Sequence, residues 1–196
     1  CLGGLDETIH ISQVDMVVEG PNSRLVQLPE LEASEADRII ANHVMGLLED
    51  GSTIQLGIGA LPNIVGAMIA RSGLKDLGVH TEMLADSYVD MYEAGRITGK
   101  HKGIDRGKMV YTFALGSQKL YDFLDNNHVA AIFPVSYTND PNVIGSNPKV
   151  IAINNAIEVD LFSQVASESS GARQISGTGG QLDFIMGAHR SEGGKG

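Results

Sequence analysis

At 196 residues the chain has room for one domain with a sizeable core, which excludes a protein of two large domains. The 42% apolar and 19% charged residues exclude the disordered, collagen-like and coiled-coil classes and indicate a globular fold. With 14 Lys and Arg against 24 Asp and Glu, the net charge is -10, which argues against sequence-independent binding of nucleic acid or of an anionic membrane.

The distribution of charge and the cysteine content indicate where an anion could bind and which compartment suits the protein. The first 100 residues carry 6 basic and 15 acidic side chains and the rest carry 8 and 9, so the second half is the better place for an anion. The single cysteine, Cys1, forms no disulfide within the chain, and no signal peptide or membrane-length apolar run is present. We therefore expect a cytoplasmic protein. The non-Met start and the glycine-rich end (191–196) predict an excised fragment.

The first third of the sequence predicts one strand and one helix. Residues 9–18 alternate loosely between apolar and polar side chains, which predicts a strand that ends at Gly20. Ser34 is followed by acidic residues and then by apolar residues at helical spacing, which predicts a helix that ends before Asp50 and Gly51.

From residue 53 onward, a unit of apolar strand, small or polar turn, and helix recurs. The predicted strands are Thr53–Leu56, Leu77–Thr81, Met109–Leu115, Val129–Phe133 and Val150–Ile153, and the helices begin at Pro62, near Asp86 and after Ser117. This alternation predicts an α/β fold with a mostly parallel open sheet flanked by helices. Ligands of such sheets lie beyond the carboxyl ends of the strands, so turns 57–62, 82–87 and 115–117 should share one edge.

Two of these turns carry candidate binding or catalytic residues. Gly57-Ile58-Gly59 stands between a strand and a helix, where backbone N–H groups can face a phosphate or carbonyl oxygen; the alternative is a tight turn without a ligand. It lacks the third glycine of a dinucleotide fingerprint and the Gly-Lys-Ser/Thr of a P-loop. Glu82 follows a strand and can act as a base or nucleophile; the alternative is a solvated carboxylate.

Other segments offer further candidates. The loop 176–184 carries three glycines whose N–H groups could stabilise an oxyanion, and Gly193-Gly194-Lys195 adds a cation; a flexible linker is the alternative for both. The six histidines are scattered without metal-ligand spacing, so we expect no metal site. Asp86, Asp90 and Glu93 predict an exposed helix face.

Five sequence segments together resemble the acetyl-CoA hydrolase/transferase family, within the family I CoA-transferases. They are GIGALP (57–62), GVHTEM (78–83), TFALGSQKLYDFLDNN (112–127), AINNAIEVDL (152–161) and GTGGQLDF followed by GGK (177–195). The likeness is strongest to 4-hydroxybutyrate CoA-transferases and butyryl-CoA:acetate CoA-transferases. It implies the NagB/RpiA/CoA-transferase-like fold. It also implies that residues 1–30 end a preceding domain or form a connector, and that residues 31–196 form a C-terminal domain truncated at its end.

The resemblance also implies a reaction and its residues. CoA would move between an acyl-CoA and a short-chain carboxylate through a glutamyl-CoA thioester on Glu82, without a metal or a tightly bound cofactor. Glu158 is the rival carboxylate, although its apolar neighbours predict a solvent-facing strand. Gly177 or Gly179 would donate an N–H to the thioester oxygen. The implied contacts with CoA are Gly57, Ile58, Gly59, Ala60, Leu61, Asn154, Gly177 and Lys195.

Two further expectations follow from the resemblance. The rest of the site would come from an N-terminal domain of the same protein, and the assembly would be a homo-oligomer. Two alternative functions stay open: an acyl-CoA hydrolase that uses the same site, with water in place of the acceptor, and a CoA-binding module without turnover.

Overall fold

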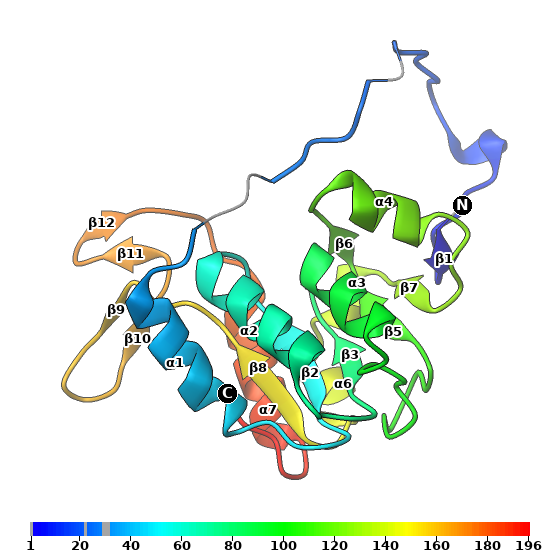
Figure 1. Cartoon of the computed structure of the whole chain (residues 1–196). Coiled ribbons are helices and arrows are strands. Elements are labelled where there is room, and N and C mark those ends of the chain that lie inside the picture. The colour runs from blue at the N-terminus through cyan, green and yellow to red at the C-terminus, as the bar shows by residue number, and fades with distance from the viewer. Residues whose placement is uncertain (1, 22, 29–31) are drawn as a thin grey trace.

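The centre of the molecule is a parallel six-stranded sheet (Figure 1). The structure is a computed structural model that describes residues 2–21, 23–28 and 32–196. Cys1 and the domain boundary predicted near residue 30 lie outside the described residues. The strand order is β1 (Gly3–Gly4), β7 (Ala130–Ile132), β5 (Met109–Tyr111), β3 (Gly78–His80), β2 (Thr53–Leu56) and β8 (Val150–Ile153). The predicted α/β class with a mostly parallel sheet is confirmed.

Helices cover both faces of this sheet (Figure 1). One face carries α1 (Glu35–Met45), α2 (Ala60–Arg71), α3 (Asp86–Glu93) and α4 (Gln118–Leu124); the other carries α5 (Val135–Thr138), α6 (Pro141–Gly145) and α7 (Gln181–Arg190). Side chains alternate along each strand, so Ile54 and Val79 pack into the larger core beneath α1 to α4. Phe184 of α7 anchors the smaller core on the opposite face.

The start of α1 follows from its sequence. The Ser34 hydroxyl accepts from the backbone N–H of Asp37 at 3.2 Å, and the Asp37 carboxylate accepts from the backbone N–H of Ser34 at 2.9 Å. This reciprocal capping box satisfies two N–H groups that the helix cannot pair internally. The helix start predicted at Ser34 is therefore confirmed.

A short break in two neighbouring strands sets the position of Glu82. Beyond β3 and β5 the pair continues as β4 (Met83–Leu84) and β6 (Phe113–Ala114), and partner residues differ by 30 positions on both sides of the break. The Glu82 carbonyl accepts from the backbone N–H groups of Thr112 and Phe113 at 3.0 and 3.2 Å. Glu82 therefore lies in a fixed backbone just past the carboxyl end of β3.

The strand predicted over residues 9–18 is wrong. The segment has a single 3-10 turn, η1 (Ile11–Gln13), capped by His10, whose backbone N–H donates to Gln13 Oε1 and whose Nδ1 accepts from the Ser12 backbone N–H. Most of its apolar side chains are exposed. A strand needs a neighbour for its N–H and C=O groups, and no described residue pairs with this one. Figure 1 shows this stretch outside the body of the molecule, after β1 has joined the sheet edge beside β7.

Two small hairpins join β8 to α7. They are β9 (Glu158–Val159) with β10 (Val165–Ala166), and β11 (Ser169–Ser170) with β12 (Arg173–Gln174). Glu158 is exposed on the first hairpin, as its sequence neighbours predict. Among the residues that the structure describes, no helix is both long and apolar enough to cross a membrane.

Candidate active site

The turns at the carboxyl ends of the strands meet at one edge, as the sequence predicts. They line a cavity of about 610 Å³ to which all three turns contribute, through residues 58–59, 83, 85–87 and 115–117. Part of the wall comes from Asn63 of α2 and Leu28 of the N-terminal segment. The cavity therefore lies on the side of the sheet that carries α2, α3 and α4.

The Glu82 carboxylate lies at the same edge but faces the opposite helix layer. Its Oε1 accepts from the side-chain amide of Asn139 at 3.2 Å, and its Oε2 accepts from the backbone N–H of Gly180 at 3.0 Å. The side chain is half-buried. Two donors from different elements thus hold both carboxylate oxygens in one orientation at the end of β3.

These two donors come from the ends of helices on the second layer. Asn139 directly follows α5, and Gly180 directly precedes α7. A Cβ at Gly180 would lie 2.7 Å from Glu82 Oε2 and 2.6 Å from Asn139 Nδ2, so only glycine permits this close approach. Gly180 is one of the three glycines of loop 176–184 that the sequence offers as donors, although the family resemblance points to Gly177 or Gly179 instead. Asn139 was not predicted from the sequence, although it stands in the polar turn after strand 129–133.

Beneath Glu82 lies His80, which is completely buried. Its Nε2 lies 2.8 Å from the Thr138 carbonyl oxygen, and its Nδ1 has no hydrogen-bond partner within the described part of the chain. Burial lowers the pKa of His80 to about 4, and the nearby Lys102 ammonium acts in the same direction. The imidazole is therefore neutral at physiological pH.

The buried imidazole makes the folded protein sensitive to acid. The unfolded chain binds a proton at this site near pH 6.5 and the folded chain only near pH 4, so the free energy of unfolding falls as the pH drops through this window. Between pH 7 and pH 5 we expect wild type to lose about 2 kcal/mol more than His80→Gln, which cannot titrate there. Urea titrations at both pH values measure this difference. Equal losses in the two proteins would contradict it.

A tyrosine fixes the turn that carries Glu82 from the other face. The buried Tyr88 hydroxyl accepts from the backbone N–H of Leu56 at 2.7 Å and donates to Thr81 Oγ1 at 3.1 Å. Thr81 Oγ1 in turn donates to the Met83 carbonyl at 3.0 Å. Two hydroxyls in series therefore tie the end of β2 to both residues that flank Glu82.

Replacing Tyr88 with phenylalanine should lower the free energy of unfolding by about 1–3 kcal/mol, because the Leu56 N–H loses its partner in a buried site. Tyr121→Phe is the matched control, since the Tyr121 hydroxyl donates to the Val26 carbonyl at an exposed position and should contribute at most about 1 kcal/mol. Urea denaturation compares the two variants. A Tyr88→Phe variant as stable as Tyr121→Phe would show that water or a neighbour replaces the lost bond.

The structure brings together the predicted CoA contacts of two neighbouring strands. Gly57 follows β2 beside Asn154, which follows β8, and a Cβ at Gly57 would lie 3.4 Å from Asn154 Oδ1. Asn154 exchanges two side-chain hydrogen bonds of 3.1 Å with Gln55. Gly59 has φ of +119° and is the N-cap of α2, so the turn leads directly into the first residues of that helix, Ala60 and Leu61. Ile58 is exposed beside the cavity.

The other predicted contacts lie farther apart. Gly177 is exposed with open space around it, and a Cβ at Gly179 would lie 3.8 Å from Glu82 Oε2. Lys195 forms backbone hydrogen bonds along β8, and its ammonium lies 3.4 Å from the Leu47 carbonyl, which precedes β2. The Lys195 ammonium is thus near the amino ends of the strands, and the Gly57 turn is at their carboxyl ends.

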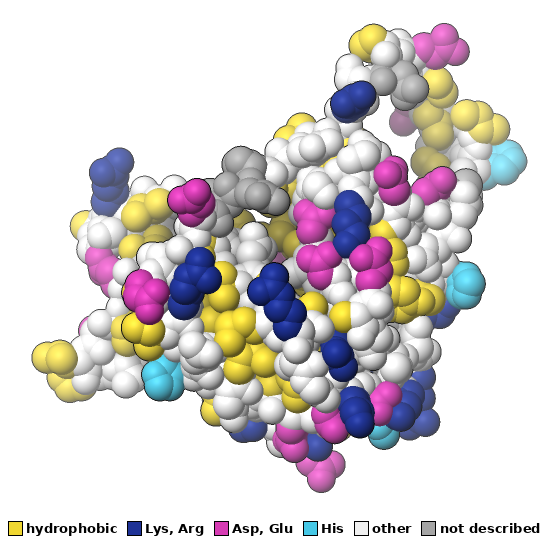
Figure 2. Space-filling view, in the orientation of Figure 1, with side chains coloured by type: hydrophobic (Ala, Val, Ile, Leu, Met, Phe, Trp, Pro, Cys, Tyr) yellow, Lys and Arg dark blue, Asp and Glu magenta, His cyan; other side chains and the backbone are white. Residues whose placement is uncertain are grey.

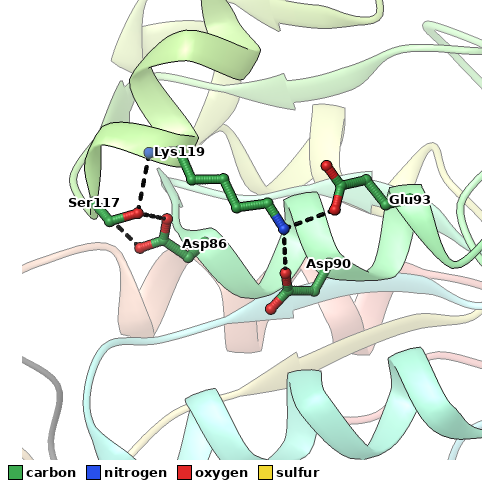
Figure 3. Close-up of polar contacts among 5 residues, drawn as sticks. All are labelled: Asp86, Asp90, Glu93, Ser117 and Lys119. Atoms are coloured by element: carbon green, nitrogen blue, oxygen red, sulfur yellow. Dashed lines mark hydrogen bonds and ion pairs between the residues drawn. The ribbon is translucent and has the colours of Figure 1, made fainter.

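The acidic residues of α3 are not simply an exposed face. The Asp86 carboxylate is half-buried and accepts from the Ser117 backbone N–H at 2.8 Å and from its hydroxyl at 2.6 Å (Figure 3). Asp90 and Glu93 are exposed and both contact the Lys119 ammonium at 2.7 Å, which raises the pKa of that lysine. Figure 2 shows these charges gathered over α3 and α4. Together they join α3 to the start of α4 on one wall of the cavity.

Comparison with known proteins gives the family. Residues 116–196 match the acetyl-CoA hydrolase/transferase C-terminal domain. The whole chain is 52% identical to the butyryl-CoA:acetate CoA-transferase of Anaerostipes caccae and covers 44% of its length. The chain belongs to the acetyl-CoA hydrolase/transferase family. This confirms the resemblance on which the prediction of Glu82 as the reactive carboxylate depends, whereas the roles of the individual residues stay predictions.

Further proteins match over almost the same span. The 4-hydroxybutyrate coenzyme A transferase of Clostridium kluyveri is 43% identical, and the match covers 97% of this chain and 44% of the relative. The crystal structure of RipA from Yersinia pestis is 39% identical with a TM-score of 0.91, covering 98% of this chain and 43% of that one. The chain therefore spans less than half the length of these relatives.

Proposed function

We propose that the chain is the C-terminal part of a CoA-transferase that moves CoA between an acyl-CoA and a short-chain carboxylate of the butyrate, acetate or 4-hydroxybutyrate type. The observation that carries the proposal is the Glu82 carboxylate, held at the carboxyl edge of the sheet by Asn139 and Gly180. The family membership and the names of the relatives support the class of reaction.

In the proposed mechanism Glu82 is a covalent carrier. One Glu82 oxygen attacks the thioester carbon of acyl-CoA, the C–S bond breaks, and CoA leaves as a thiolate from an acyl-glutamyl anhydride. The thiolate then attacks the Glu82 carboxyl carbon, and the acyl group departs as a carboxylate. Glu82 now carries CoA as a thioester. An acceptor carboxylate reverses the same steps and takes CoA away.

The geometry of Glu82 suits the second step. When the thiolate attacks the Glu82 carboxyl carbon, negative charge develops on a Glu82 oxygen, and Oε2 already accepts the Gly180 N–H at 3.0 Å. A donor placed before the charge develops contributes about 2.7–4 kcal/mol to the transition state. The Asn139 amide on Oε1 orients the carboxylate so that one oxygen can act as the nucleophile.

Substrate contacts complete the proposal. We assign the CoA chain to the Gly57–Leu61 turn and Asn154, as the resemblance implies. The resemblance also implies a phosphate or pantetheine contact for Lys195, and that contact would require its side chain to turn away from the Leu47 carbonyl toward the Gly57 turn. The remaining wall of the site would come from an N-terminal part of the same protein, because the relatives are more than twice as long as this chain. A homo-oligomer in the cytoplasm is part of the same proposal.

The test uses the natural full-length protein that contains these residues. It is incubated with butyryl-CoA or acetyl-CoA without an acceptor acid, and its intact mass and peptide map are recorded. The proposal expects a CoA adduct on the peptide that holds Glu82, lost on addition of acetate and absent from Glu82→Gln. Glu158→Gln is the control, since Glu158 also accepts a glycine N–H but lies on the exposed hairpin.

Two results would favour the alternatives. Steady loss of acyl-CoA without an acceptor would indicate an acyl-CoA hydrolase, in which water attacks the glutamyl intermediate. CoA binding with no adduct and no turnover would indicate a binding module and would remove the covalent role of Glu82.

A further inference from the structure

His80 lies on the same side of its strand as Glu82. Glu82 lies in the break just past β3, and both side chains contact the layer of α5 and α7. His80 is the last residue of β3 and is completely buried, whereas Glu82 is half-buried at the edge above it. The imidazole is therefore a buried polar group directly beneath the carboxylate, and the proposed mechanism does not use it.

The contact of the ring with Thr138 defines its hydrogen position. Nε2 is 2.8 Å from the Thr138 carbonyl oxygen, and a carbonyl only accepts, so Nε2 must carry the hydrogen. Nδ1 is then a bare lone pair without a partner among the described residues. Keeping an unpaired nitrogen in a buried site costs free energy, which indicates that His80 is present for the bond that Nε2 makes.

Both elements that supply donors to Glu82 contact this imidazole. Thr138, which accepts the Nε2 hydrogen, is the last residue of α5 and directly precedes Asn139. On α7 the ring faces Phe184, with 6.2 Å between ring centroids, and the Phe184 N–H donates to the Gly180 carbonyl at 3.0 Å. The His80 side chain thus contacts the residue that precedes Asn139 and the first helical turn that follows Gly180.

We infer that His80 is a positioning residue: its neutral Nε2–H holds the end of α5 so that the Asn139 amide stays on the Glu82 carboxylate. The inference rests on the proposed function, because it assigns His80 a role in the chemistry of Glu82. The lowered pKa of His80 agrees with this role, since one protonation state is kept at physiological pH. Without His80, the Thr138 carbonyl before Asn139 loses the only side-chain hydrogen bond that the described residues make to it.

The test compares variants that differ in reach rather than in polarity. In the full-length protein, His80→Gln can place an amide N–H near the Nε2 position, whereas His80→Asn is too short and His80→Phe has no donor. We expect adduct formation on Glu82 in a single turnover to slow by about 10-fold or more in His80→Phe and His80→Asn. His80→Gln should recover most of the rate. CoA affinity should change by less than about threefold in all variants that fold.

A double-mutant cycle with Asn139→Ala tests whether His80 acts on the adduct step through Asn139. If His80 acts through Asn139, adding His80→Asn to Asn139→Ala should slow the adduct step by less than about twofold more. Independent, multiplying effects would overturn the inference, and so would a His80→Gln variant no faster than His80→Asn. Failure of the proposed function looks different: Glu82→Gln would then form the adduct or keep its turnover, whatever the His80 variants do.

Discussion

Glu82→Gln should lower the rate of CoA transfer by about 10³-fold or more while leaving CoA affinity within about threefold of wild type. Glutamine keeps the length of the side chain and one oxygen for a donor, but its amide cannot form the anhydride or release CoA from a thioester. In the variant, one of the two donors, the Asn139 amide or the Gly180 N–H, faces an NH₂ group in place of an oxygen. A small decrease in the free energy of unfolding is therefore also expected. Steady-state transfer from butyryl-CoA to acetate, together with calorimetric CoA binding, measures both quantities.

Glu158→Gln is the matched control for this prediction. Among the residues that the structure describes, Glu158 is the other carboxylate with a glycine N–H donor, here from Gly171. It also accepts from the Ser170 hydroxyl, which lowers the pKa of Glu158. It lies on an exposed hairpin, so its replacement should change turnover by less than about twofold. If Glu158→Gln lost turnover while Glu82→Gln stayed active, the reactive carboxylate would be Glu158 on the hairpin and not Glu82.

Gly180→Ala should reduce turnover by about 10²-fold with little change in the free energy of unfolding. The backbone of Gly180, with φ of -81°, accepts alanine without strain. The added Cβ, however, would lie 2.7 Å from Glu82 Oε2 and 2.6 Å from Asn139 Nδ2, so the carboxylate or the amide must move. Displacing a reacting group by about 1 Å costs roughly 10²-fold in rate. Single-turnover adduct formation and urea denaturation separate the two effects.

Gly177→Ala and Gly179→Ala distinguish the three glycines of the loop. Gly177 has open space where a Cβ would stand, so its alanine variant should keep its rate within about twofold. At Gly179 the added Cβ would be 3.8 Å from Glu82 Oε2, an ordinary contact, and a small effect is expected. If Gly177→Ala or Gly179→Ala lost more activity than Gly180→Ala, the oxyanion donor would be the residue named from the family resemblance.

Local sequence determined most of the sheet and its helices. Thr53–Leu56 and Val150–Ile153 are short apolar runs between turn residues, and both are strands with the predicted bounds. Ser34 with Asp37 predicts a capped helix start because the two partners are three residues apart. Where the pattern failed, at residues 9–18, the missing factor was a neighbouring strand, which no property of the segment itself can provide.

Resemblance to the family singled out Glu82, but not the groups that hold it. Asn139 is 57 positions from Glu82 and Gly180 is 98 positions away. Their contacts arise because α5 and α7 pack on one face of the sheet, and α5 ends and α7 begins at the edge where β3 ends. No periodicity links such residues, and several glycines of the loop look alike until one of them meets the carboxylate.

The sequence by itself thus determined the class of fold, the order of its elements and the edge where the chemistry should lie, because these depend on composition and on short-range patterns. Only the tertiary structure decided which donors hold Glu82, which tautomer His80 adopts and how Tyr88 ties β2 to the Glu82 turn. Each of these depends on a distance of about 3 Å between groups far apart in the chain. Such distances arise only when the helix layers pack against the sheet.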